Sequence, residues 1–253
     1  MLTARASASF SLVLMISYLL GAFGAFSLAP LAIGFLVTGP LGQFILKPPS
    51  SSQAQEIDFP ARLGIPLAVG GMALISVWML SVRFALWEGI TGTDSLWYHM
   101  PFAVHFYQSE SLMGFDFAEP LFQTYFYPSS GSLFHALGMV FFDRDFLTPL
   151  VNLGWLGFAI LAGAAIGSER KVAATSALGV AAVFAGEGVL RGSAGSAMVD
   201  TPATFFFLAA VLLMIKRPQT RAALLLSGLA VGAGVSVKLT IIAPAALLGI
   251  AVV

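Results

Sequence analysis

Most residues of this chain that can do acid–base chemistry lie between positions 88 and 146, a segment that contains all 3 histidines and most of the 12 acidic residues. The segment opens with Thr91-Gly-Thr-Asp94-Ser-Leu-Trp-Tyr98-His99-Met-Pro101. Only 9% of the whole chain is charged, and this polar, aromatic segment stands between runs that are apolar enough to cross a bilayer. A carboxylate in this position can act on a substrate that itself lies in lipid.

Asp94 stands just before a stretch with helical periodicity. Between Leu96 and Tyr107, apolar side chains recur at spacings of three and four residues, which predicts a helix lying on the membrane surface. Its apolar face would contain Leu96, Met100, Ala103, Val104 and Tyr107, and its aromatic anchors at headgroup depth would be Trp97, Tyr98, Phe102 and Phe106. The carboxylate of Asp94 then either caps free backbone amides at the start of this helix or faces a substrate.

The histidines do not have the spacing of metal ligands. His99 and His105 are six residues apart and His135 lies far downstream, so no pair falls on one helical face with ligand spacing. Each histidine either orients a carboxylate or phosphate or makes an ordinary hydrogen bond at the interface. Asp143-Arg144-Asp145 resembles the Asp-x-Asp pair that chelates a divalent ion in many nucleotide-sugar enzymes, but its place just before an apolar run favours charges that mark a helix end.

Two further polar residues interrupt apolar sequence. Asp200 precedes Thr201-Pro202, so it either caps an apolar helix or lies at the outer end of that helix, on the same side as Asp94. Lys238 divides the apolar stretch 222–253 into halves of about 16 residues, each rising only about 24 Å if helical. Because a lysine near the middle of a bilayer costs roughly 2.5 to 3.5 kcal/mol, we expect Lys238 to mark a turn in the outer leaflet or to meet an anion.

The composition places the chain among integral membrane proteins. Hydrophobic residues make up 58% of it and include 22 phenylalanines, which leaves too little polar surface for a soluble domain. The equal numbers of 12 basic and 12 acidic residues, without a lysine-rich tract, argue against nucleic acid as a partner. Because the chain has no cysteine, neither disulfides nor thiolate metal sites order the long loop.

The apolar runs predict an all-α, multi-pass transmembrane bundle with seven or eight spans and one long outer loop that contains juxtamembrane amphipathic helices. These runs are 8–28, 29–46, 63–87, 146–167, 172–190, 202–215, 222–237 and 239–253. The second and the last three are short for hydrocarbon roughly 30 Å thick. The first run is alternatively a signal peptide, because Arg5 precedes it and small residues end it.

Basic residues between the runs predict the orientation and the division of the chain. Loop 88–146 and segment 191–201 are expected outside, with Arg83 and Arg191 as exceptions at or near outer ends. We divide the chain into an N-terminal transmembrane hairpin (1–46), a cytoplasmic linker (47–62) and a transmembrane core (63–253). The connections expected in the cytoplasm are marked by Lys47 and Arg62, by Arg170 and Lys171, and by Lys216, Arg217 and Arg221.

Several motifs occur in an order that is typical of one enzyme family. The first is Asp94-x-x-x-Tyr98-His99-Met-Pro101 with Phe126-Tyr127-Pro128 in the same loop, and the second is Met198-Val-Asp200-Thr-Pro202 before a phenylalanine-rich run. The third, Gly232-Ala-Gly-Val-Ser-Val-Lys238-Leu-Thr240, is a glycine-rich run that ends in a Lys-x-Thr turn. These three motifs, together with the order of apolar runs from 63 to 253, resemble the pattern of bacterial GT-C glycosyltransferases. Those enzymes are relatives of protein O-mannosyltransferases and aminoarabinose transferases.

The resemblance implies transfer of a sugar from a polyprenyl-phosphate donor to an acceptor hydroxyl at the outer face of the bacterial inner membrane. Asp94 would be the general base, and Lys238, with Arg191 or Arg83, would offset negative charge on the departing lipid phosphate. Tyr98, His99 and Asp200 would bind donor or acceptor. The partners would be the lipid-linked sugar and membrane lipids. Whether a divalent metal takes part is left open, and no metal ligand is assigned.

Departures from the family pattern keep other functions open. Family members usually continue through further spans, whereas this sequence ends at Val253 in an apolar run, so we expect a truncated chain or a shortened relative. The N-terminal hairpin is an addition, and the Asp-Glu pair of some relatives is Asp94-Ser95 here, which leaves a single carboxylate. The alternatives are a non-catalytic accessory subunit that packs against other membrane proteins, and a transporter with Lys238 in a broken span.

Overall fold

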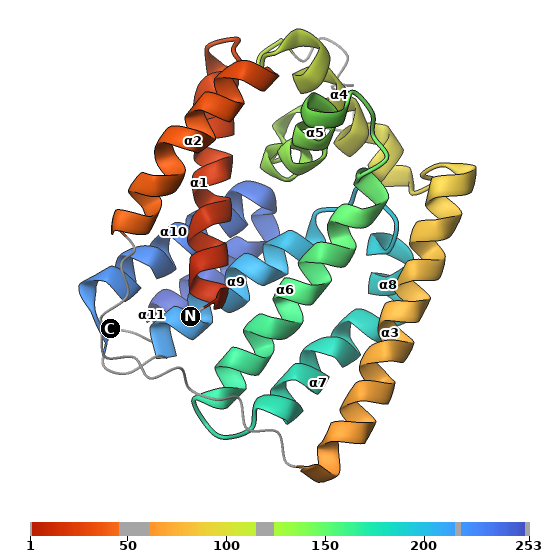
Figure 1. The fold of residues 1–253 in the computed structure, drawn as a ribbon, viewed down its shortest axis with the longest axis vertical. Helices are drawn as coiled ribbons and strands as arrows, with labels where there is room; N and C mark the ends of the chain where they lie inside the picture. Colours follow the sequence, from red (N-terminus) through yellow and green to blue (C-terminus); the bar gives the residue numbers. More distant parts are fainter. Residues whose placement is uncertain (1, 46–60, 115–123, 216–218, 251–253) are drawn as a thin grey trace.

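The computed structural model describes residues 2–45, 61–114, 124–215 and 219–250, and among these the only regular secondary structure is helical. The prediction of an all-α fold is confirmed for the described residues. In chain order (Figure 1) the α-helices are α1 (Leu2–Ala22), α2 (Leu28–Ile45), α3 (Ala61–Glu88), α4 (Met100–Ser109), α5 (Ser130–Phe142), α6 (Thr148–Ser168), α7 (Ala173–Ala185), α8 (Glu187–Ser193), α9 (Asp200–Ile215), α10 (Arg221–Val237) and α11 (Ile242–Ile250). The short η elements are η1 (Ser95–His99), η3 (Thr124–Phe126) and η4 (Leu239–Ile241).

Three described helices are long and apolar enough to cross a membrane: α1, residues Val69–Glu88 of α3, and α6. The pair α7 and α8, which is bent by 70° at Gly186, makes a fourth candidate if it is counted as one span. The other apolar helices are shorter: Leu28–Pro40, Ser130–Phe142, Asp200–Ile215, Arg221–Val237 and Leu239–Ile250. The described residues are therefore those of a helical membrane protein and contain three or four candidate spans by length and composition, fewer than the runs predicted.

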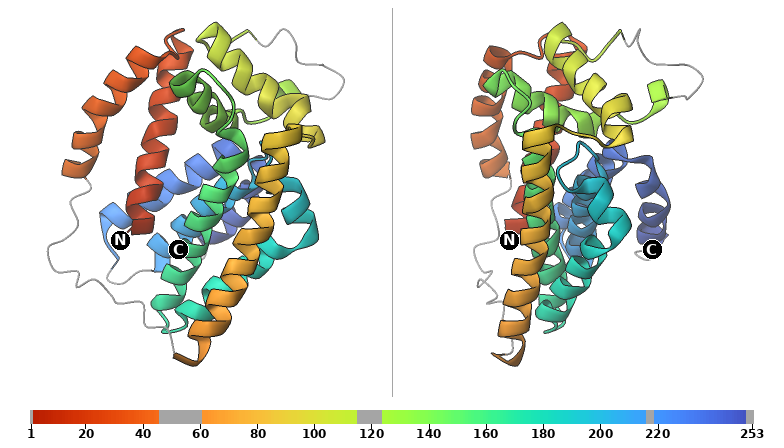
Figure 2. Two further views of the ribbon diagram at one scale, coloured as in Figure 1. Left: turned by 45° about the vertical axis from the view of Figure 1, so that its right-hand side comes forward. Right: turned by 90° about the vertical axis from the view of Figure 1, so that its right-hand side faces the viewer.

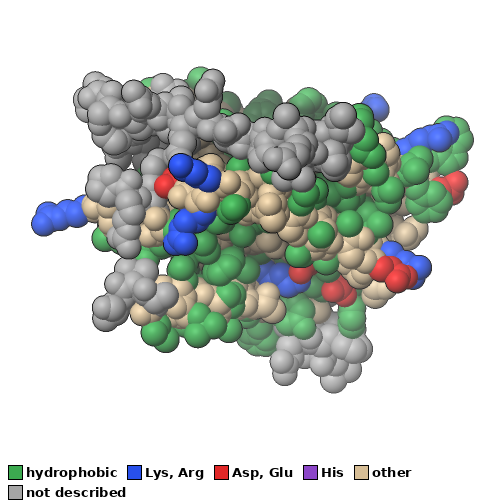
Figure 3. All heavy atoms as spheres, turned by 90° about the horizontal axis from the view of Figure 1, so that it is seen from below, with side chains coloured by type: hydrophobic (Ala, Val, Ile, Leu, Met, Phe, Trp, Pro, Cys, Tyr) green, Lys and Arg blue, Asp and Glu red, His purple; other side chains and the backbone are tan. Residues whose placement is uncertain are grey.

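The surface of the bundle is apolar in the way that contact with lipid requires. Along α3 the large exposed hydrophobic side chains among the described ones are Val69, Met72, Ile75, Val77, Met79, Leu80, Phe84, Leu86 and Trp87. Figure 3, the view from below, shows hydrophobic side chains among polar ones at the lower end of the bundle, with charged side chains as separate spots. A soluble monomer rarely exposes contiguous apolar surface on this scale.

The bundle is built on the helix pairs α6–α7, α9–α10 and α6–α9, and α1 packs across α9 and α10. An aromatic cluster joins them at the centre: the ring of Phe10 in α1 lies 4.4 Å from that of Trp155, which lies 4.8 Å from Phe134 and 5.3 Å from Phe205. Aromatic pairs at these separations add to the energy of burial. The described part of the predicted N-terminal hairpin thus shares one core with the helices that follow.

Helices α4 and α5 lie together at one end of the bundle, and the connection between α6 and α7 lies at the opposite end (Figures 1 and 2). Most of the predicted cytoplasmic linker 47–62 lies outside the described residues, as do residues 115–123 of the long loop. Lys216 and Arg217, two of the charges used to predict orientation, also lie outside them.

The helix predicted between Leu96 and Tyr107 is present, and Met100 and Ala103 of its predicted apolar face are buried, but the buried side extends beyond that face. Phe102 and Phe106, predicted to anchor in headgroups, are 1% and 0% exposed, whereas Leu96 is 54% exposed. The reason is that α4 packs against α5, and Phe106 meets Phe26 with ring centroids 6.4 Å apart. Phe102 and Phe106 are therefore covered by protein, whereas Trp97 is 42% exposed.

Candidate functional site

The site begins with a widened helical turn, η1, which follows Asp94 and contains Tyr98. In this π-helical turn the backbone N–H of Met100 donates to the carbonyl of Ser95, five residues earlier. Pro101 has no N–H and cannot donate to the carbonyl of Trp97 as a regular α-helix would require. A proline that prevents one α-helical bond is a physical reason for a π turn, and such turns are frequent at functional sites.

Asp94 and Tyr98 lie on the same face of this helical segment because they are four residues apart. Asp94 is already in helical conformation, with φ −64° and ψ −32°, and its side chain makes no capping hydrogen bond. Instead, the Tyr98 hydroxyl donates to Asp94 Oδ2 at 3.3 Å. The sequence left open whether Asp94 caps the helix or faces a substrate, and the structure does not show the capping hydrogen bond. Within the described ranges the second carboxylate oxygen has no hydrogen bond, so it can accept one from another donor.

The electrostatics of Tyr98 keep it a hydrogen-bond donor. Burial of the ring raises the pKa of the Tyr98 phenol, and the charge of the nearby Asp94 carboxylate raises it further. Smaller contributions come from Tyr127 and Asp200. The phenol therefore stays protonated at neutral pH and orients the Asp94 carboxylate rather than competing with it for protons.

His99 lies in the interior and has a different role from its neighbour Tyr98. Its side chain is 3% exposed, and its Nδ1 lies 3.3 Å from the hydroxyl of Ser132 in α5. Burial lowers the pKa of His99 to about 3, with smaller contributions from His135 and Lys238. Burial also lowers the pKa of His135 to about 4, against the opposite effect of a hydrogen bond to the backbone of Ala197. Both imidazoles are neutral at physiological pH and tie η1, α5 and the segment before α9 together.

The second half of the site is an ion pair between Asp200 and Lys238. Asp200 lies in the first turn of α9, and Lys238 has extended backbone between α10 and η4. This geometry confirms the predicted break at Lys238, and the ammonium donates to Asp200 Oδ1. Both side chains are partly exposed, and the backbone carbonyl of Asp200 also accepts from the Thr204 hydroxyl at 2.8 Å.

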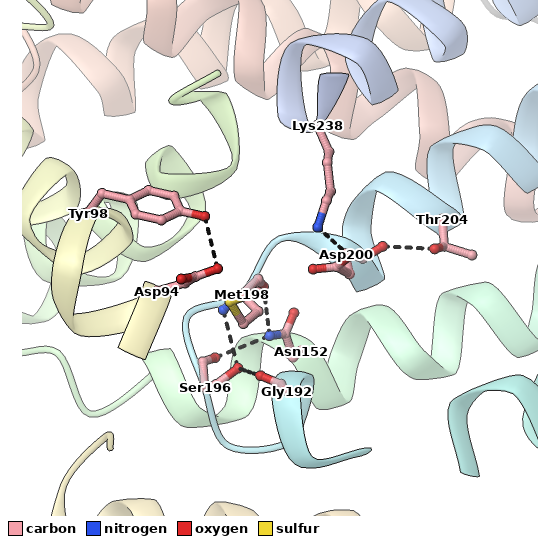
Figure 4. Close-up of polar contacts among 9 residues, drawn as sticks. All are labelled: Asp94, Tyr98, Asn152, Gly192, Ser196, Met198, Asp200, Thr204 and Lys238. Atoms are coloured by element: carbon pink, nitrogen blue, oxygen red, sulfur yellow. Dashed lines mark hydrogen bonds and ion pairs between the residues drawn. The ribbon is translucent and has the colours of Figure 1, made fainter. Parts of the chain in front are cut away.

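The two halves meet through the segment that precedes α9. The backbone N–H of Ala197 donates to the hydroxyl of Ser95 at 3.1 Å, which ties this segment to the residue next to Asp94. Figure 4 shows the Tyr98–Asp94 pair and the Lys238–Asp200 pair facing each other across one space. The structure therefore brings together four of the six residues selected from the sequence, with His99 in the layer of buried contacts around them.

Arg191, the sixth selected residue, is engaged elsewhere. Its guanidinium forms an ion pair with Glu187 at 2.8 Å, one turn earlier on α8, and both side chains are largely exposed. An exposed pair of this kind contributes little to stability. Nothing in the contacts of Arg191 connects it with Asp94 or Lys238 in the part of the chain that the structure describes.

The acidic pair around Arg144 ends a helix. Asp143 caps the C-terminus of α5 with φ 55°, and its carboxylate accepts from the Tyr107 hydroxyl. This arrangement agrees with the interpretation of these charges as helix-end markers. Over the described ranges, no group of three or more histidine, cysteine, aspartate or glutamate side chains is placed to hold a metal ion.

Asn152 and Ser95 are two residues of the site that the sequence analysis missed. Asn152, in the first turns of α6, is fully buried and donates Nδ2 to the carbonyls of Ser193, Ser196 and Met198. A lone asparagine in the apolar run 146–167 was the available signal, because a buried amide must find partners. Ser95 gave no signal, since its neighbour Ala197 lies 102 residues away in the chain.

The arrangement combines a partly solvated carboxylate with a cation at the end of an apolar bundle. The carboxylate can accept a proton, and the ammonium, which has three N–H donors, retains two after bonding to Asp200. Such a pair suits a reaction in which a proton leaves one group while negative charge develops on another. Comparison of the chain with models of protein families, with curated proteins and with solved structures finds no match.

Proposed function

We propose that this protein is a GT-C-type inverting glycosyltransferase that moves a sugar from a polyprenyl phosphate to an acceptor hydroxyl at the outer membrane face. The observation that carries the proposal is the Asp94 carboxylate, oriented by Tyr98, opposite the Lys238–Asp200 pair at the end of an apolar bundle. A donor anchored in lipid delivers its anomeric carbon to this level of the membrane. The enzyme then needs no nucleotide-binding domain.

The chemistry is one displacement with one proton transfer. The acceptor oxygen attacks the anomeric carbon from the side opposite the phosphate, and its proton passes to the free oxygen of Asp94. The bond between the anomeric carbon and the phosphate oxygen breaks, and the polyprenyl phosphate leaves with the electron pair. Lys238 offsets the charge that develops on this oxygen. Direct displacement inverts the configuration at the anomeric carbon.

The other selected residues support these two groups. Tyr98 orients Asp94, and Asp200 holds the Lys238 ammonium toward the same space. We assign His99 to support of η1 rather than to sugar contact, because its side chain is buried against Ser132. Arg191 has no part in the proposed step, since it is paired with Glu187 at the surface.

We further propose that the chain crosses the inner membrane of a bacterium seven or eight times, with the helices α4 and α5 of loop 88–146 on the outer side. The shorter apolar helices α2, α9, α10 and α11 would supply the additional spans. The positive-inside rule supports this orientation, because Arg170 and Lys171 lie in the α6–α7 connection, at the opposite end of the bundle from α4 and α5.

The test is a transfer assay with purified protein in lipid vesicles, supplied with a panel of polyprenyl-phosphate sugars and with glycolipid, polysaccharide and peptide acceptors. Asp94→Asn should reduce transfer by about a thousandfold or more, because it removes the base while preserving shape. The matched control is Glu110→Gln, which neutralises an exposed carboxylate of the same loop at the end of α4 and should transfer like the wild type.

Two results would contradict the proposal. Substantial turnover by the Asp94→Asn protein would remove the base assignment. Absence of transfer from every donor, with a correctly folded wild type, would favour the accessory membrane subunit, which would then co-purify with a catalytic partner.

A further inference from the structure

One buried amide, that of Asn152, contacts the segment between α8 and α9 at three places. Its Nδ2 lies 3.1 Å from the carbonyl oxygens of Ser193 and Ser196 and 2.8 Å from that of Met198, so its two N–H groups are shared among three acceptors. Figure 4 shows the bonds to Ser196 and Met198. Asn152 is 0% exposed, so water does not compete for these bonds. The segment curls around the amide and ends at Asp200, the first residue of α9.

The same segment is fixed on two other sides. Gly195 has φ +69°, and a Cβ added to it would lie 2.6 Å from the carbonyl oxygen of Ser81 and 3.2 Å from Cβ of Ala85, both in α3. Asp94 follows α3 in the chain. On the other side, the N–H of Ala197 donates to the hydroxyl of Ser95, the residue after Asp94. The segment therefore touches α6, α3 and η1 within a few residues of both carboxylates.

The chemistry of the amide fixes its orientation. If the Asn152 amide were flipped, Oδ1 would face three carbonyl oxygens, none of which can donate. Oδ1 itself has no hydrogen-bond partner among the described residues, so only the donor side of the amide is used. A side chain that buries an unpaired acceptor to direct its donors at one segment has a role that packing alone does not explain.

We infer that Asn152 is a positioning residue, which holds segment 193–199 so that the Asp200–Lys238 pair faces the Asp94 carboxylate at a fixed separation. The effect on catalysis rests on the proposed function, whereas the hold on the segment does not. Asn152 touches neither Asp94 nor Lys238 in these contacts and acts through the backbone of segment 193–199 and the hydroxyl of Ser95. A displacement of about 1 Å in such an arrangement can cost a hundredfold in rate.

Amide hydrogen exchange of the full chain in lipid nanodiscs tests the hold without any substrate. Asn152→Asp preserves the shape but places carboxylate oxygens against the three carbonyls. It should speed exchange in segment 193–199, including the N–H of Ala197, by about tenfold or more, whereas amides of α6 and α7 change less. Ser95→Ala, a milder variant, should speed exchange at Ala197 alone. The matched control is Ser227→Ala, which removes another buried bond to a backbone carbonyl, that of Ala210 at 3.1 Å.

The transfer assay supplies the second measurement. Turnover per folded molecule should fall about tenfold to a hundredfold in Asn152→Asp and less in Ser95→Ala, and Ser227→Ala should match the wild type. Unchanged exchange in segment 193–199, or an equal increase throughout the protein, would overturn the inference. Faster exchange in segment 193–199 together with wild-type turnover would also overturn the inference. In that case the turnover of Asp94→Asn would still test whether Asp94 is the general base. If the wild type transfers from no donor, the proposed function fails, and exchange alone decides whether Asn152 holds the segment.

Discussion

Replacement of Gly131 by alanine tests the contact on which the geometry of the site depends. A Cβ at this position in the first turn of α5 would lie 2.3 Å from Cγ1 of Val199 and 3.3 Å from Cγ1 of Val237. Val199 precedes Asp200 and Val237 precedes Lys238, so the added methyl group pushes on the side chains of the residues next to both members of the ion pair. We expect the variant to be less stable and to have a displaced ion pair.

The magnitude follows from two opposing terms. Overpacking of a buried contact costs about 1 to 3 kcal/mol of unfolding free energy. Alanine in place of glycine inside a helix contributes about 0.5 to 1 kcal/mol in the other direction. Gly138→Ala, in the same helix, is the matched control, because its Cβ would lie 3.4 Å from Cβ of Leu147, an ordinary contact. The difference between the two variants isolates the clash, and we expect Gly131→Ala to be the less stable by about 1 to 3 kcal/mol.

The assay is reversible unfolding in mixed micelles with increasing sodium dodecyl sulfate, followed by circular dichroism and tryptophan fluorescence. Free energies of unfolding of wild type and both variants are compared under one set of conditions. If Gly131→Ala is as stable as Gly138→Ala, the N-terminus of α5 does not rest on Val199 and Val237, and the reasoning that places α5 against the ion pair is wrong.

Three further predictions concern the core, the histidines and the cation. Phe10→Ala should lower the unfolding free energy by about 3 kcal/mol or more, because the ring lies in the central aromatic cluster, whereas Phe23→Ala, at an exposed position, should change it by less than about 0.5 kcal/mol. His99 and His135 have pKa values near 3 and 4, below that of a free histidine, so the unfolded chain binds more protons below about pH 6.5. Stability is therefore complete above pH 6.5 and is lost as the pH falls toward 4, by up to about 1.4 kcal/mol per pH unit for each histidine. Lys238→Met should lower the transfer rate by about a hundredfold or more while stability changes little, because the ion pair is partly exposed.

Each of these predictions has an outcome that contradicts it. Equal losses in Phe10→Ala and Phe23→Ala would mean that α1 is not part of the core. An unfolding free energy that is constant between pH 7 and pH 5 would show that the imidazoles are solvated, and His135→Gln, measured in parallel, should reduce the slope. Wild-type transfer by Lys238→Met would remove the proposed role of its charge on the leaving phosphate.

Helix content and helix breaks were accessible from the sequence because they are local properties. Lys238 was expected to interrupt an apolar stretch, and α10 does end at Val237. The helix that follows Asp94 was also expected, and it is present. Its buried face was obtained only in part, since Met100 and Ala103 are buried as expected but Phe102 and Phe106 also face protein rather than headgroups. Periodicity identifies the apolar residues of such a helix, and only its packing against α5 decides how many of them are covered.

The contacts among the site residues could be predicted from the sequence only in part. The sequence indicated that Asp94, Asp200 and Lys238 share one end of the bundle, because alternation of spans places their loops on one side. It did not indicate that Lys238 bonds to Asp200, that Tyr98 bonds to Asp94, or that Arg191 prefers Glu187. The last of these was within reach, since Glu187 and Arg191 are four residues apart on a helix.

By itself the sequence determined that this is a helical membrane protein whose histidines and most acidic residues lie in one segment between apolar runs, because composition and hydropathy are properties of single residues and short stretches. Only the tertiary structure decided which groups meet. Asn152 finds three carbonyls more than 40 residues away, and Ser95 accepts from Ala197 at a separation of 102 residues. The physical reason is that a buried hydrogen bond requires a partner at about 3 Å in three dimensions. Chain spacing carries no information about that partner until the helices have packed.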